Sequence, residues 1–175
     1  ELIRLISDLT DQMKQIFSEG FLRISENFSK IFTEMFGGGH AELKLSDPND
    51  PLQSGIDIIA RLPGKNVPSL EGLSGGEKAL IAISIYFAIM HVNAPPFCFL
   101  DEVETALDDI NVERFANYMK HSDLETQFIC ITHRRGTMEA ADMLYGVTMQ
   151  ERGVTKLIEL NVAQLEMDLK SLENQ

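Results

Sequence analysis

Residues 73–78 read Leu-Ser-Gly-Gly-Glu-Lys and lead directly into a long, mainly apolar run at 79–90 that contains neither glycine nor proline. Ser74 and Glu77 have the three-residue spacing of a capping box, in which each side chain satisfies a backbone N–H group at a helix start. Because the run is apolar on every face, the pattern predicts a helix buried on all sides. A helix of this kind requires a domain core around it.

The start of this helix also suits an anion. A helix N-terminus presents free N–H groups and the positive end of the helix dipole. The absent side chains at Gly75 and Gly76 allow the backbone to approach a phosphate closely. Ser-Gly-Gly-Glu is short enough to occur by chance, so a capped helix that merely enters a core is the alternative interpretation. The neighbouring motifs decide between the two.

Composition indicates one soluble globular domain. The chain has 175 residues, of which 44% are hydrophobic and 24% charged, as in ordinary folded domains. No apolar run is long enough to cross a bilayer and no signal peptide opens the chain, so we expect no membrane partner. Cys98 and Cys130 lie inside apolar runs, which predicts buried free thiols of a cytosolic protein. The net charge of −12 argues against nucleic-acid binding by this chain alone.

The first 36 residues have a helical pattern. Steps of four and three residues connect apolar positions as in a coiled-coil seam, namely Leu2, Ile6, Leu9, Met13 and Ile16. The phase shifts at Phe17, and about two heptads are fewer than an independent coiled coil needs. An amphipathic helix packed on the domain is one interpretation. We favour a coiled-coil stump that enters a globular domain near Gly20. Since the chain opens with Glu1 rather than Met, we expect it to begin inside a longer polypeptide.

Two pairs of strands are predicted outside the central region. Alternation at 41–45 and 56–62, with turn residues at 47–51, indicates an antiparallel pair that follows three glycines. Alternation at 144–150 and 154–160 indicates a closing hairpin, and residues 162–172 have the pattern of a surface helix. Gly64-Lys65 is not part of a phosphate-binding P-loop, because position 59 is Ile and Asn66 follows the lysine. No other stretch of the sequence matches a P-loop.

The centre of the chain predicts a β-α-β unit. Residues 97–100 and 128–131 are short apolar runs, typical of strands buried on both faces of a parallel sheet. The helix between them, at 110–121, should turn Val112, Phe115 and Met119 inward, with Ala116 beside them. A short helix is expected near 137–141. Functional groups are expected off the carboxyl ends of parallel strands, where the sequence places Asp101, Glu102 and His133.

These three residues suit phosphate chemistry. Asp101 can hold Mg²⁺ through water beside nucleotide phosphates, and Glu102 can orient or polarise the attacking water. His133 can hydrogen-bond a γ-phosphate, and the turn at 106–108 can reach a facing molecule. Taken singly, each residue also has a structural explanation, but the three motifs in this order are hard to obtain by chance. We expect the remaining histidines, His40, His91 and His121, at the surface.

Three stretches closely resemble the C-terminal half of the head of SMC (structural maintenance of chromosomes) proteins. Residues 73–78 resemble the signature motif, residues 99–108 Walker B and the D-loop, and residues 131–139 the switch-histidine segment. The likeness extends from Phe36 through Met149, and the sequence after His133 is similar to that of a bacterial chromosomal SMC. Transporters of the wider ABC class usually have Gln at the position of Glu77 and Pro at that of Val103.

The resemblance implies an α/β fold, the C-terminal lobe of an ABC-type ATPase head. It would combine a parallel sheet and flanking helices with antiparallel hairpins and a coiled-coil stump. Residues 1–20 would end the coiled coil, 21–161 form the lobe and 162–175 the tail. An N-terminal half would supply Walker A. The resemblance further implies a cytoplasmic, nucleoid-associated ATPase that binds ATP and Mg²⁺ and acts in chromosome condensation and segregation.

Site roles and partners also follow from the resemblance. Glu102 and His133 would be catalytic, and Asp101 would hold Mg²⁺. The nucleotide would be contacted by Asp101 and by further residues, some of which would reach it from the second head of a homodimer. These further residues are Ser74, Gly75, Gly76, Glu77 and Asp108. A kleisin would dock through its C-terminal winged-helix domain on the 144–160 hairpin, for which a plain solvent-facing hairpin is the alternative, and DNA would be bound in the full complex. Two alternatives remain open: a kleisin-binding module that binds no nucleotide, and half of a related coiled-coil DNA-repair ATPase.

Overall fold

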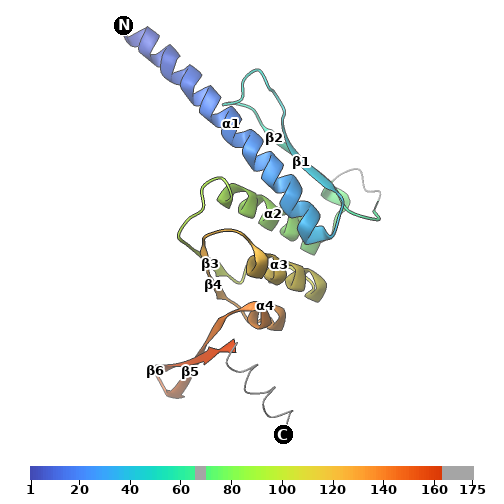
Figure 1. The fold of residues 1–175 in the computed structure, drawn as a ribbon, viewed down its shortest axis with the longest axis vertical. Helices are drawn as coiled ribbons and strands as arrows, with labels where there is room; N and C mark the ends of the chain where they lie inside the picture. Colours follow the sequence, from blue (N-terminus) through green and yellow to red (C-terminus); the bar gives the residue numbers. More distant parts are fainter. Residues whose placement is uncertain (66–69, 163–175) are drawn as a thin grey trace.

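The computed structural model describes residues 1–65 and 70–162, arranged with the N-terminus at one end and a β-hairpin at the other (Figure 1). The helices are α1 (Leu2–Phe36), α2 (Gly75–Met90), α3 (Asp109–His121) and α4 (Arg135–Ala140), with a 3-10 turn at Leu70–Gly72. The strands are β1 (His40–Leu45), β2 (Ile56–Arg61), β3 (Phe97–Asp101), β4 (Gln127–Ile131), β5 (Met143–Glu151) and β6 (Val154–Asn161). The α/β architecture agrees with the sequence prediction.

Helix α1 has two distinct parts. Its C-terminal part packs into the core through Phe28, Ile31, Phe32, Met35 and Phe36. Its N-terminal part projects away from the other elements (Figure 1). The predicted seam is exposed there, from 75% at Leu2 to 50% at Leu9. Within the described residues, this seam therefore has no packing partner, as expected of one strand of a coiled coil.

Two glycines set the path from α1 into the first hairpin. Gly37 ends the helix in the left-handed conformation, with φ of 68°, which glycine adopts without a steric penalty. At Gly39, with φ of 88°, a Cβ atom would lie 2.4 Å from the carbonyl oxygen of Arg61. β1 and β2 pair antiparallel from His40 opposite Arg61 to Leu45 opposite Ile56. This pairing confirms the predicted strand pair.

The predicted β-α-β unit is present, with β3 and β4 parallel and Asp101 opposite Ile131. The expectation that both strands are buried on both faces is wrong. Cys98 and Leu100 face the core, whereas Phe97 and Phe99 are 54% and 63% exposed. The cause is that the core lies on one face of this two-stranded sheet, and nothing among the described residues covers the other.

The prediction that α2 is buried on all sides is wrong for the same reason. Leu80, Ile81 and Phe87 are buried, and the ring of Phe87 lies against those of Phe115, Tyr118 and Phe128. On the opposite side of the helix, Tyr86 and Ile89 are 46% and 50% exposed. In α3, Val112, Phe115 and Ala116 are buried as expected, together with Asn111 and Tyr118, while Met119 is half-buried.

Three smaller expectations are resolved by the side chains. Cys98 and Cys130 are free thiols, but only Cys98 is buried and Cys130 is half-buried. His40 and His121 are exposed. His91 is not a surface residue: its side chain is 21% exposed, and its Nε2 atom lies 2.8 Å from the hydroxyl of Tyr118.

The last described element is the hairpin of β5 and β6. Its antiparallel register runs from Met143 opposite Asn161 to Glu151 opposite Val154, which confirms the predicted closing hairpin. Many of its apolar side chains are exposed, namely Tyr145, Val147, Met149, Val154, Leu157, Ile158 and Leu160. The predicted tail helix lies outside the described residues from position 163 onward. In the part of the chain that the structure describes, no helix is long and apolar enough to cross a membrane.

Candidate functional site

The capping box predicted for residues 74–77 is present. The backbone N–H of Glu77 donates to Ser74 Oγ over 3.2 Å, and the N–H of Ser74 donates to Glu77 Oε2 over 2.8 Å. The second carboxylate oxygen of Glu77 accepts from Lys65 Nζ over 2.5 Å. These bonds, first that from Lys65 and then that from the Ser74 backbone, lower the pKa of Glu77 below its usual value of 4.5. The carboxylate is therefore held as an anion at the start of α2.

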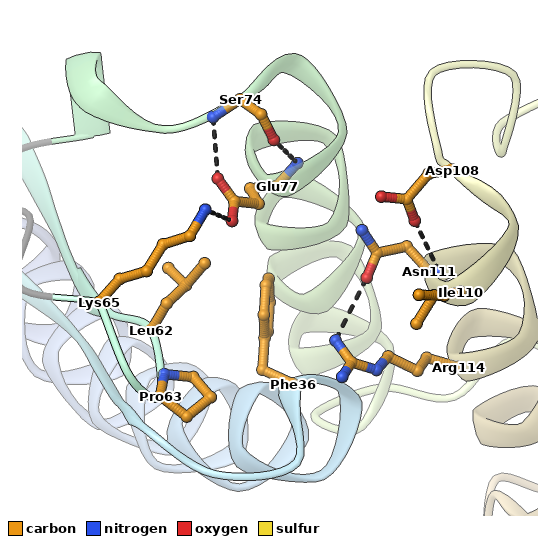
Figure 2. A pocket seen from close by; sticks show the side chains of 10 residues that line it. All are labelled: Phe36, Leu62, Pro63, Lys65, Ser74, Glu77, Asp108, Ile110, Asn111 and Arg114. Atoms are coloured by element: carbon orange, nitrogen blue, oxygen red, sulfur yellow. Dashed lines mark hydrogen bonds and ion pairs between the residues drawn. The ribbon is translucent and has the colours of Figure 1, made fainter.

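A pocket of about 350 Å³ lies beside this helix start. Figure 2 shows Ser74 and Glu77 above it, the segment from Leu62 to Lys65 on one side and Asp108 with α3 on the other. Asp108 caps α3, since its Oδ1 accepts from the backbone N–H of Asn111 over 2.9 Å. The pocket therefore joins the starts of two helices.

The two glycines of the motif have different surroundings. A Cβ atom at Gly75 would meet nothing within 4 Å, whereas one at Gly76 would lie 3.1 Å from the carbonyl oxygen of Ala106. Gly76 thus leaves room for the chain's own 106–108 turn. Ser74 and Gly75 are exposed, so the helix start is open to a molecule from outside at these two residues.

Asp101, Glu102 and His133 meet at the carboxyl end of the parallel strands. Asp101 is the last residue of β3 and is exposed, and its side chain has no hydrogen bond or ion pair within the described chain. Glu102 Oε1 lies 3.5 Å from His133 Nδ1, and both side chains are more than half exposed. The backbone N–H of Glu102 donates to the carbonyl oxygen of Ile131 over 2.9 Å, which fixes the carboxylate next to the end of β4.

The predicted residues thus fall into two groups. Ser74, Glu77 and Asp108 line the pocket, whereas Asp101, Glu102 and His133 are not among its lining residues. The turn between β3 and α3 connects the groups, because it follows Glu102 and touches Gly76. Within the described chain, the two groups do not form one closed site.

Two functional candidates were missed by reasoning from sequence. Lys65 was considered only in the rejected P-loop match, yet it binds Glu77, which is 12 positions away. Glu104 was given no role, yet it is 2% exposed. Its Oε1 accepts hydrogen bonds from the hydroxyls of Thr132 and Thr137. No local sequence pattern predicts either contact. The only available signal was the pair of hydroxyl donors, Thr132 and Thr137, on either side of His133 near a strand end.

Fold and site together define an α/β domain with acidic and histidine side chains at the ends of parallel strands and an open, capped helix start. Residues 10–156 match the family model described as the RecF/RecN/SMC N terminal domain. The chain therefore belongs to the RecF/RecN/SMC family.

Individual relatives agree with this assignment. The chain is 53% identical over 163 residues to the chromosome partition protein Smc of Bacillus subtilis, covering 93% of this chain and 14% of that protein. A Pyrococcus furiosus Smc head domain, solved with an extended coiled coil and bound to the C-terminal domain of ScpA, superposes with a TM-score of 0.83 at 40% identity. It covers 98% of this chain and 43% of that one.

A further solved chain matches over nearly its whole length. It comes from a study of ATP-driven dimerization and DNA-stimulated activation of SMC ATPases, and it has a TM-score of 0.76 at 40% identity, covering 93% of this chain and 98% of that one. The present chain spans only 14% of the curated Smc proteins of Bacillus subtilis and Desulfitobacterium hafniense.

Proposed function

We propose that this chain is the C-terminal half of an ATP-binding and ATP-hydrolysing SMC head that acts in chromosome condensation and segregation. The observation that carries the proposal is the strand register, which brings Asp101, Glu102 and His133 to one edge of a parallel sheet. The description of the matched family model names the N-terminal domain of RecF, RecN and SMC proteins. Assignment to the C-terminal half instead rests on the signature-like helix start and on the absence of a P-loop from the sequence.

Each residue at the strand ends has a proposed role. The exposed Asp101 carboxylate is a hard oxygen ligand that fits Mg²⁺ held through water, and bound Mg²⁺ would neutralise phosphate charge. Glu102 would accept a hydrogen bond from the attacking water and so orient it. His133 would donate a hydrogen bond to the γ-phosphate. The fit for Mg²⁺ is supported by the donor type and by the lack of any competing partner for Asp101 within the described residues.

The missing Walker A loop would come from an N-terminal half-head. The uncovered sheet face supports this, because Phe97, Phe99 and Ile131 are each more than half exposed. Contiguous exposed apolar surface of this kind marks an interaction site. Residues 1–20 would then pair with the helix of the other half as the end of a coiled coil, with 21–161 as the lobe and 162–175 as the tail.

A second head would complete the nucleotide site. Ser74, Gly75 and Gly76 of one head would cap the γ-phosphate bound by the other, with Glu77 and Asp108 beside them. The exposure of Ser74 and Gly75 supports this role, since donors at a helix start can bind phosphate only where they are accessible. The separation of the two residue groups within one chain is also what a site shared between heads requires.

Further partners are proposed from the relatives. The ScpA-bound head of Pyrococcus furiosus supports a kleisin that docks through its C-terminal winged-helix domain. We place that contact on the β5–β6 hairpin, whose apolar side chains are exposed. The Bacillus relative is a chromosome partition protein, which supports a nucleoid location in the cytoplasm and DNA binding by the full complex rather than by this acidic chain.

Two alternatives stay open. In the first, the isolated chain, which has no P-loop, would act as an interaction module that binds a kleisin and the other half-head but no nucleotide. Calorimetry of the chain with Mg-ATP tests this, and micromolar binding would contradict it. The other alternative is half of a related coiled-coil DNA-repair ATPase, which a kleisin pull-down that retains nothing would favour.

The decisive experiment is ATP hydrolysis by this chain alone and after mixing with the N-terminal half of the same protein. We expect hydrolysis only in the mixture, and its loss with Ser74→Arg, because an arginine side chain would occupy the open helix start. If neither sample hydrolysed ATP although the two halves were shown to associate, the ATPase proposal would be refuted.

A further inference from the structure

Glu104 is an ionisable side chain in an unexpected place. It lies in the turn after β3, two residues beyond Glu102, and it is 2% exposed. Carboxylates are almost never buried to this extent unless they are paired. Within the described residues Glu104 has no cationic partner. It is instead held by two neutral donors, Thr132 and Thr137, whose hydroxyls both donate to Oε1.

The hydrogen bonds around Glu104 have a defined direction. Thr132 Oγ1 accepts from the backbone N–H of Arg134 over 2.9 Å, so its single hydroxyl proton is free to be donated to Glu104. Thr137 donates to the same carboxylate oxygen over 3.1 Å. Glu104 therefore fixes residues on both sides of His133.

The same two segments are joined at further points. The backbone N–H of Glu102 bonds to Ile131, and Arg134 Nη2 donates to the carbonyl oxygen of Leu107 over 3.2 Å and to Asp109 Oδ1 over 2.7 Å. Among the side-chain bonds, that between Thr137 and Glu104 is buried, whereas the bonds of Arg134 to Leu107 and Asp109 are partly buried and exposed, respectively. The turn after β3 and the segment after β4 are thus tied together around one buried carboxylate.

The connection through Glu104 bears on the backbone conformation of Glu102. Glu102 has φ of 48° and is the one non-glycine residue with positive φ among the described residues. Such a conformation is strained for a residue that carries a side chain, and it persists only where the surroundings enforce it. The turn enforces it through Thr105, whose N–H and Oγ1 both donate to the carbonyl oxygen of Glu102, over 3.1 and 2.7 Å. The anchor of that turn is the side chain of Glu104.

We propose that Glu104 is a positioning residue that holds Glu102 and His133 in one fixed arrangement, through its hydrogen bonds with Thr132 and Thr137. This role presupposes the ATP hydrolysis proposed above. It implies that the turn at 102–108, which touches Gly76 at the helix start, and the segment at 132–137 move as a unit. Displacement of either segment would then misplace both the water-orienting carboxylate and the imidazole.

Thr137 offers the cleanest test, because Thr137→Val preserves shape and removes one hydroxyl, while Thr137→Ser retains the hydroxyl as a matched control. In the assembled full-length protein we expect kcat to fall on the order of 10-fold to 100-fold in Thr137→Val, as for misplaced catalytic groups. We expect KM for ATP to stay within about twofold, because Glu104 is buried and presents no surface to a ligand. Thr137→Ser should restore kcat.

A second readout needs no nucleotide. Amide hydrogen exchange should quicken about tenfold at Glu102 and Arg134 in Thr137→Val, with both amides remaining protected in Thr137→Ser. The double variant of Glu104→Gln and Thr137→Val should lower kcat by less than the product of the two single fold-changes, since both residues belong to one hydrogen-bond network.

The outcomes separate the two proposals. A wild-type protein without ATPase activity refutes the proposed function, whatever the variants do. An active wild type in which Thr137→Val lowers the melting temperature but leaves kcat and the exchange of both amides unchanged makes Glu104 a structural tether and overturns the positioning role. Strict additivity of Glu104→Gln and Thr137→Val overturns it as well.

Discussion

At the scale of single residues, Glu77 makes two different bonds with one carboxylate. One oxygen completes the capping box with Ser74 and the other binds Lys65. A ligand at the helix start would meet this carboxylate already neutralised by the lysine. Lys65 therefore moderates the repulsion that an acidic residue would otherwise exert on a phosphate.

The capping box makes a prediction about pH. The pKa of Glu77 is lowered in the folded state by its bonds to Lys65 and Ser74, so its contribution to stability is present above the unfolded value near 4.5 and is lost as pH falls through the lower folded value. In Glu77→Gln we expect the stability deficit seen at pH 7 to shrink as the pH is lowered below the unfolded value of 4.5 to an acidic pH at which Glu77 is protonated. Urea unfolding at both pH values measures this, and an unchanged deficit would contradict it.

Cys130 makes a second prediction at this scale. Burial, followed by the nearby Glu104 charge, raises the pKa of its thiol to about 11. With this pKa, about one thiol in 1,000 is ionised at pH 8. Only the thiolate reacts. We expect iodoacetamide to label Cys130 slowly in the native protein and rapidly in urea. Peptide mass spectrometry reads both states, and fast native labelling would show that the site is open.

The site residues divide by how far their partners lie in sequence. The Ser74–Glu77 pair was predictable because a capping box is made within one helical turn. The bonds of Glu104 to Thr132 and Thr137 span 28 and 33 positions, so they exist only once β3 and β4 are paired. Local reasoning found the residues that begin and end elements. It missed those whose environment is made by the fold.

At the scale of elements, α2 and the β3–β4 sheet share one feature: each is apolar on both sides but covered on one. The sequence predicted burial on all sides, and that expectation failed because a hydrophobic pattern reports what an element will bury, not which chain buries it. Tyr86 and Ile89 on α2, with Phe99 and Ile131 on the sheet, mark where the remaining cover must lie. The hairpins and the parallel pairing were predictable, since alternation and turn residues are local signals.

The uncovered face predicts a specific loss of binding. Phe99 is 63% exposed, and complete burial of a phenylalanine side chain contributes about 1.5–3 kcal/mol. We expect Phe99→Ser to weaken association with the N-terminal half about 10-fold to 100-fold. Calorimetric titration of one half into the other measures the change. Unaltered affinity would mean that the two halves meet elsewhere.

A matched control lies on the closing hairpin. Tyr145 is 60% exposed, similar to Phe99, but it belongs to β5, where we place the kleisin. Tyr145→Ser should leave binding of the N-terminal half unchanged and should weaken binding of a kleisin C-terminal domain. Phe99→Ser should weaken binding of the N-terminal half, and in a protein whose two halves are joined in one chain it should leave binding of the kleisin C-terminal domain unchanged. Equal effects of both changes on both partners would indicate general destabilisation.

At the scale of the whole molecule, the acidic chain and its two separated residue groups fit an assembly whose chemistry occurs between subunits. One group, at the ends of β3 and β4, lies beside the uncovered face where the half-head that supplies Walker A would dock. The other, at the start of α2, is open to a second head. Association within a head and engagement between heads would therefore use different surfaces, and single substitutions can separate them.

Two substitutions in the assembled head should have opposite effects on dimerisation. Glu102→Gln keeps the shape of the side chain but removes the carboxylate that orients water, so hydrolysis should fall on the order of 100-fold to 10,000-fold while ATP-bound heads stay engaged. Ser74→Arg should prevent engagement while each head still binds ATP. Sedimentation velocity with and without ATP, together with nucleotide titration, distinguishes these states. Glu125→Gln, an exposed change before β4, serves as the control. Hydrolysis near the wild-type rate in Glu102→Gln would remove Glu102 from the mechanism, and ATP-dependent dimers of Ser74→Arg would remove the helix start from the interface.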